Sequence, residues 1–197
     1  MGCLKSFIFI FFKMIGFFSA IDRFFERIKQ MHVVKVFLLA WVINFVWSLV
    51  VGGTLILLGV KFSQHVSSNN EFTNSFLLLP LVGFAEEVLF RWGPSLAISL
   101  MLTYLYRYGK ISKGKFFYVE KCVLFCVVVV TSIIFGWVHG NVFNVLIQGV
   151  SGVIIFIIYL RCFFLERDMG VRDRWQVVPF FEAGLYHTMV NAFLIFV

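Results

Sequence analysis

Residues 36–60 read VFLLAWVINFVWSLVVGGTLILLGV, an apolar run without a single charged side chain. A helix needs about 20 such residues to cross the hydrocarbon core of a bilayer, so this run is long enough to span it. Further apolar runs follow at 75–106, 120–139, 142–161 and 177–197. The sequence therefore predicts an all-α, polytopic integral membrane bundle with five transmembrane helices.

The composition excludes a soluble domain. Of the 197 residues, 61% are hydrophobic and 14% are charged, whereas soluble domains are about 45–50% apolar and about 25% charged. Phenylalanine alone supplies 27 residues. One soluble core of this size cannot bury so many apolar side chains, and a lipid environment can accommodate them.

The N-terminal segment differs from the rest of the chain. Residues 6–21 are strongly apolar but short, and Lys13 interrupts them, so a short anchor and an interfacial helix both stay open. Residues 22–33 mix charged and aromatic side chains, which is typical of an amphipathic helix at the membrane surface. We therefore expect an N-terminal anchor or interfacial segment over 1–35 and a helical membrane domain over 36–197.

The formal net charge of +7 reflects loops between the apolar runs. The basic residues gather in 22–35, 107–121 and 161–174, as expected of loops that face the cytoplasm. This alternation orients the helices consistently across the membrane. It favours membrane lipids, and not nucleic acid, as the partner of the basic side chains.

The stretch FAEEVLFRWG places Glu86, Glu87 and Arg91 inside an apolar run. Each charge at such depth costs roughly 2.5–3.5 kcal/mol on insertion scales unless it finds a partner or water. Residues four apart share a helix face, so Glu87 and Arg91 can pair along their own helix. Glu86 lies about 100° around that helix and is free to face a different neighbour. The same run could also be broken near Gly93-Pro94, because proline removes a backbone hydrogen bond.

Two further runs carry polar side chains that suit hydrolysis. IIFGWVHGN contains His139, and YHTMVNAF contains His187 and Asn191 on one helix face. A carboxylate and an imidazole can bind and deprotonate a water, and a second imidazole with an amide can donate to an oxyanion. Alternatively, Glu86, His139 and His187 could bind a zinc ion with an open water position. Glu182 lies in the last run, either beside His187 or at the interface.

The three stretches form an ordered set of motifs. EEVLFR matches EExxxR, FGWVH matches FxxxH and HTMVN matches HxxxN, on successive apolar segments. This set resembles the CAAX protease and bacteriocin-processing family, also called the Abi family of intramembrane proteases. The resemblance covers about residues 75–197. It implies an intramembrane endopeptidase that cleaves a peptide or a lipid-anchored protein, in the plasma membrane of a bacterium.

The resemblance also implies a role for each motif residue. Glu86 would be the general base that activates water, and His139 would help to bind that water. His187 and Asn191 would form the oxyanion site. Glu87 and Arg91 would be a supporting pair. The resemblance leaves zinc open, but we favour a site without a cofactor, because Asn191 is a better oxyanion donor than zinc ligand.

A second function belongs to a different class. The same residues could stabilise a non-proteolytic bacteriocin-immunity or partner-binding membrane protein. The two functions differ in what the polar side chains should do. In the protease, they should surround one space that water and a peptide carbonyl can reach. In the scaffold, they should saturate one another.

Overall fold

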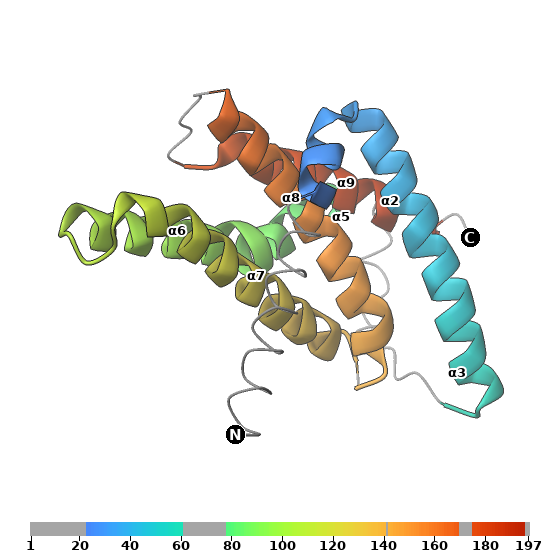
Figure 1. Cartoon of the computed structure of the whole chain (residues 1–197). Helices are drawn as coiled ribbons and strands as arrows, with labels where there is room; N and C mark the ends of the chain where they lie inside the picture. Colours follow the sequence, from blue (N-terminus) through green and yellow to red (C-terminus); the bar gives the residue numbers. More distant parts are fainter. Residues whose placement is uncertain (1–22, 61–77, 141, 170–174, 196–197) are drawn as a thin grey trace, which may run out of the picture.

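The computed structural model describes residues 23–60, 78–140, 142–169 and 175–195. Within these ranges the chain forms helices and no strand, and the helices assemble into one bundle (Figure 1). Four of the described helices are long and apolar enough to cross a membrane: Val33–Leu57, Pro80–Arg107, Val119–Val138 and Val145–Asp168. The expected all-α membrane bundle is confirmed, and these four helices coincide with four of the five expected spans.

The first spanning helix joins α2 (Val33–Trp47), the π-helical turn η1 (Ser48–Gly52) and α3 (Gly53–Leu57). The second joins α5 (Leu78–Glu87), the π-helical turn η2 (Val88–Trp92) and α6 (Gly93–Arg107). The third is α7 (Lys113–Val138), and the fourth joins η3 (Val145–Gly149) to α8 (Val150–Asp168). Before the first of these, residues 23–30 form a separate helix, within the range expected to be amphipathic.

The fifth expected span forms the helix α9 (Val177–Ile195) but is not among the helices apolar enough to cross a membrane. Its polar side chains Glu182, His187 and Asn191 dilute an otherwise apolar sequence. Most of the inner face of α9 is nevertheless covered: Ala183 and Tyr186 are fully buried. Helix α9 packs mainly against α5 and α8.

The second spanning helix continues through Gly93 and Pro94, where a break was one of the expectations. The chain widens into η2 instead, and the Gly93 amide donates to the Val88 carbonyl. A Cβ at Gly93 would lie 2.6 Å from that carbonyl oxygen, so only glycine fits the turn. Pro94 has no N–H to donate, and a wide turn directly before it avoids the clash that proline causes inside an α-helix.

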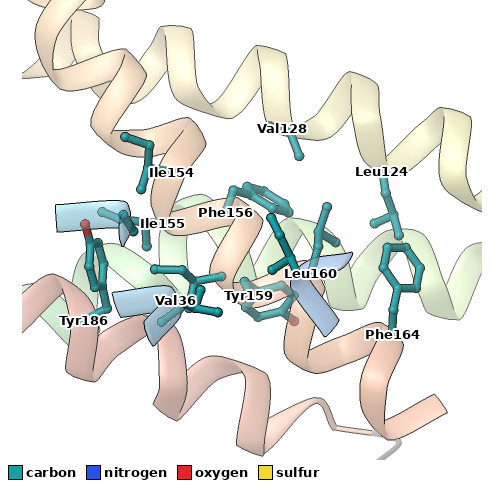
Figure 2. Close-up of a cluster of buried hydrophobic side chains, with 14 residues drawn as sticks. Val36, Leu124, Val128, Ile154, Ile155, Phe156, Tyr159, Leu160, Phe164 and Tyr186 are labelled. Carbon is teal, nitrogen blue, oxygen red and sulfur yellow. The ribbon is translucent and has the colours of Figure 1, made fainter. Parts of the chain in front are cut away.

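Helix α8 is the centre of the bundle. It packs against α7, α9 and α2, and 56% of its spanning residues are buried, against 6% for Val33–Leu57. Figure 2 shows Leu124 of α7 beside Phe164 of α8 and Tyr186 of α9 beside Ile155 of α8, with Val36 of α2 in the same core cluster. The first span therefore lies at the edge of the bundle, whereas α8 lies inside it.

Glycines allow two close contacts between helices near the polar residues. A Cβ at Gly136 of α7 would lie 2.5 Å from the Val145 Cα and 2.8 Å from the Gly149 amide nitrogen of η3. A Cβ at Gly184 of α9 would lie 2.3 Å from the Phe84 ring of α5. These contacts fix the end of α7 and the middle of α9 against their neighbours, and so fix the depth at which their histidines lie.

A buried arginine connects the helix at residues 23–30 to α8 and α9. Arg161 donates through Nε to the Ile28 carbonyl at 3.2 Å and through Nη2 to the Met31 carbonyl at 2.7 Å. Its Nη1 donates to Glu182 Oε1 at 2.8 Å. This anchor cluster (Arg161, Glu182 and the two carbonyls) gives Glu182 a partner other than His187.

Candidate active site

The η2 turn holds an ion pair at the centre of the second spanning helix. Arg91 Nη1 lies 2.9 Å from Glu87 Oε1, with both side chains almost fully buried. The Arg91 guanidinium also lies 4.4 Å from the centroid of the Phe135 ring of α7, a favourable cation–π distance. The pair that the spacing of the motif allows is therefore formed, and α7 covers it.

Glu87 also positions His187 of α9. The His187 Nδ1 lies 2.8 Å from the same Glu87 Oε1 that accepts from Arg91. Because that oxygen belongs to a carboxylate paired with a guanidinium, Nδ1 carries the hydrogen and donates it. A carboxylate that accepts from one ring nitrogen fixes both the tautomer and the orientation of the imidazole. The other nitrogen, Nε2, is thereby turned toward Glu86.

Glu86 lies between the two histidines of the motifs. Its Oε2 is 3.2 Å from His187 Nε2, and its Oε1 is 3.5 Å from His139 Nε2. The Glu86 side chain is 22% exposed and that of His139 is 29% exposed, whereas Glu87 is completely buried. The adjacent glutamates thus have different environments, and Glu86 is the one that solvent or a ligand can reach.

His139 follows the last residue of α7 and is oriented by its own helix. Its Nδ1 lies 2.6 Å from the Phe135 carbonyl oxygen, which can only accept, so Nδ1 carries a hydrogen. In the neutral ring, Nε2 then presents a lone pair toward Glu86 Oε1, another acceptor. Two acceptors 3.5 Å apart need a shared proton or a water between them. This geometry suits a water that both groups hold.

The charges nearly balance across the site. Glu86 and Glu87 contribute two negative charges and Arg91 one positive charge. Both nitrogens of His187 face carboxylate oxygens, so a protonated His187 would donate to both and bring the sum to zero. The low dielectric of a membrane interior favours such neutral groupings. With a neutral His187, one proton on Glu86 brings the same sum to zero.

Asn191 is the motif residue that stands apart. It is partly buried on α9, one turn after His187. No hydrogen bond or ion pair among the described residues joins it to Glu86, His139 or His187. The sequence also gave no role to Phe135, whose carbonyl orients His139 and whose ring lies 5.8 Å from the His187 ring. In the sequence, the position of Phe135 as the first residue of FxxxH could have indicated this role.

Within the part of the chain that the structure describes, no group of three histidine, cysteine, aspartate or glutamate side chains is placed to hold a metal ion. Of the three residues expected as alternative zinc ligands, Glu86 lies 3.2 Å from His187 Nε2 and 3.5 Å from His139 Nε2. The arrangement supports binding of water by a carboxylate and an imidazole.

No protein-family model, curated protein or solved structure matches the chain. The resemblance to the CAAX protease and bacteriocin-processing family is carried by the residues of the three motifs. Of these, Glu86 and Glu87 contact His187, and Glu86 faces His139. The helices α5, α7 and α9, far apart in sequence, thus meet at one polar site.

Proposed function

We propose that the protein is an intramembrane endopeptidase that hydrolyses a peptide bond with water activated by Glu86. The observation that carries the proposal is the position of Glu86, partly exposed and within 3.2–3.5 Å of two imidazoles from two other helices. A buried structural carboxylate would be expected to resemble Glu87 and to be enclosed by its partners. Glu86 instead is exposed enough to contact a water molecule and lies beside His139 and His187, as a general base requires.

The reaction can be written with these side chains alone. Glu86 takes a proton from a water held between it and His139, and the hydroxide oxygen attacks the peptide carbonyl carbon. His187, held through Nδ1 by Glu87, donates in its protonated form from Nε2–H to the oxyanion that forms, and Asn191 is the second donor. When the carbon–nitrogen bond breaks, protonated Glu86 delivers its proton to the amine. One water is consumed, and a carboxylic acid and an amine are released.

The location of the site supports a class of substrate. Four apolar helices make the chain an integral membrane protein, and the site lies on three packed helices of that bundle. A substrate must therefore reach it from the membrane or its surface. We propose a membrane-associated peptide or a lipid-anchored protein as substrate, in the plasma membrane of a bacterium.

A non-proteolytic immunity or partner-binding protein is the second candidate. Direct bonds join Glu87 to both Arg91 and His187, as expected of residues that stabilise a scaffold. In that case Glu86 would be one more member of the network, and its conversion to an amide would leave any protective effect on a host cell unchanged.

The test is peptide cleavage by membranes that contain the Glu86→Gln variant. We expect cleavage of a library of apolar peptides to fall by about 10²–10⁴-fold, the usual contribution of a general base. Glu182→Gln is the matched control, because Glu182 is also a partly buried glutamate but belongs to the anchor cluster. Equal cleavage by Glu86→Gln and wild type would overturn the proposal. Loss of wild-type cleavage with a chelator would establish a metal.

A further inference from the structure

A row of hydroxyls extends the buried ion pair along the second spanning helix. Glu87, Arg91, Ser95 and Ser99 follow one another at intervals of four residues, which places them on one helix face. Ser132 of α7 faces the same space, because it and Arg91 both approach Gly152 of α8. We call this set (Glu87, Arg91, Ser95, Ser99 and Ser132) the polar seam.

Each member of the polar seam has a buried polar atom with no hydrogen-bond partner among the described residues: Glu87 Oε2, Arg91 Nη2, Ser95 Oγ, Ser99 Oγ and Ser132 Oγ. Glu87 is 0% exposed, Arg91 and Ser95 1%, and Ser132 4%. A buried polar atom left without a partner costs about 1–3 kcal/mol. Five such atoms in one row are too costly for the interior of a stable bundle, so they require a partner.

The serines differ from the threonines of the same two helices, α6 and α7. Thr103 and Thr131 donate to the carbonyl four residues earlier, at 2.7 and 2.8 Å, which is how an isolated hydroxyl in a helix usually satisfies itself. Ser95, Ser99 and Ser132 make no such bond. Their hydroxyls therefore stay available to a ligand other than their own helix.

Gly152 leaves the space that a ligand needs. A Cβ at this position would lie 3.2 Å from Arg91 Nη2, 3.2 Å from Phe135 Cδ1 and 3.3 Å from Ser132 Oγ. The absence of a side chain thus lets a donor and a hydroxyl face one small gap. Buried waters typically make about three hydrogen bonds to polar groups that would otherwise be unsatisfied.

We infer that the polar seam binds a file of water molecules that leads from the Arg107 end of the second spanning helix to the ion pair beside Glu86. Successive hydroxyls lie about 6 Å apart along the helix axis, a gap that one bridging water closes. The row from Glu87 to Ser99 covers about 18 Å. Its far end is two turns from Arg107, in the basic loop expected to face the cytoplasm.

The seam gives the site a second access, separate from the one a peptide uses. Its role as the supply of hydrolytic water rests on the proposed peptidase function, whereas its occupancy by water does not. Each turnover consumes one water in a bundle surrounded by lipid. Resupply along the seam would allow a bound peptide to cover Glu86 from the other side without stopping the reaction.

Silver ion, which is close in size to a water molecule and binds thiolates, is the probe for the seam. In membranes holding the full chain with its four native cysteines replaced by alanine, we would introduce Ser95→Cys, Ser99→Cys or Ser132→Cys. The control is Ile158→Cys on α8, which is 1% exposed and belongs to the apolar core cluster. After a timed silver pulse, a maleimide added under denaturing conditions counts the thiols that remain.

We expect silver to block the three seam cysteines at least about tenfold faster than Ile158→Cys, since a dry buried site must first open locally. Rates equal to that of Ile158→Cys would overturn the inference, whatever the variants do to cleavage. Fast blocking together with full cleavage by Glu86→Gln would keep the water file and reject the peptidase.

Ser132→Ala tests the role of the seam, because it removes the hydroxyl and adds no bulk. We expect kcat for a peptide to fall about two- to tenfold, as for one lost hydrogen bond, with KM unchanged. Silver should also block Ser95→Cys more slowly in this background. Unchanged kcat and unchanged blocking would show that Ser132 holds no water of the file.

Discussion

Two buried polar clusters lie in the same bundle and are built differently. In the anchor cluster, Arg161 directs its donors to Glu182 and to the carbonyls of Ile28 and Met31. At the candidate active site, Arg91 donates to Glu87, but its Nη2 and the second oxygen of Glu87 have no partner among the described residues. The first cluster is saturated by protein groups, and the second is not.

This difference separates structural from reactive use of the same side chains. A saturated cluster joins segments and gains nothing from solvent. An unsaturated cluster with a partly exposed carboxylate keeps capacity for water and for a substrate carbonyl. Glu182 and Glu86 are both partly buried, yet one faces a guanidinium and the other faces two imidazoles. The predictions below substitute corresponding residues in the two clusters.

The largest effect on stability is expected for Arg161→Leu. It leaves Glu182 buried without its partner and removes the donors to two carbonyls, so the free energy of unfolding should fall by about 3–5 kcal/mol. Denaturant titration in detergent micelles measures it. The double variant Arg161→Leu, Glu182→Leu should recover part of the loss, because no lone charge is left. Equal stability of the single and double variants would contradict the pairing of Arg161 with Glu182.

Glu87→Gln should have the next largest effect. Glutamine still accepts from Arg91 and His187 but no longer neutralises the guanidinium, so the free energy of unfolding should fall by about 1.5–3 kcal/mol. Glu86→Gln, one residue earlier, is the control and should lose less than about 1 kcal/mol. The same titration compares the two variants. If both lost the same stability, the adjacent glutamates would not have the separate roles proposed here.

Glu182→Gln should have the smallest effect. Arg161 keeps its two carbonyl acceptors and the amide oxygen of the new side chain, so about 0.5–1.5 kcal/mol of unfolding free energy should be lost. Peptide cleavage should persist at temperatures below the unfolding midpoint. Cleavage lost at unchanged stability would instead assign Glu182 to the active site, and the contrast between the clusters would fail.

The sequence predicted those parts of the structure that depend on local periodicity. Apolar runs of sufficient length located four spans, and the spacing of Glu87 and Arg91 predicted an ion pair within one helix. The same spacing indicated that Glu86 faces another neighbour, and in the structure it faces His139 and His187. These inferences need only the helical repeat and the cost of charge in lipid.

Other features depend on contacts between segments far apart in the chain. Glu87 and His187 are 100 residues apart, and Arg161 donates to a carbonyl 133 residues earlier. Periodicity gives the face of a helix but not which neighbour that face meets or at what depth. On α9, the partners of Glu182 and His187 inside the bundle are likewise contacts that the sequence alone does not identify.

The wide turn at Val88–Trp92 has a consequence for changes in chain length. A π-helical turn closes its hydrogen bonds over five residues, so deleting one residue there would restore a regular α-helix. In a regular α-helix four residues cover the turn that five residues of η2 cover, so α6 would keep nearly the same rotation relative to α5. The wide turn that accommodates Pro94 would be lost instead. A deletion in η2 should therefore cost stability through Pro94, and not through the alignment of Ser95 and Ser99 with Glu87.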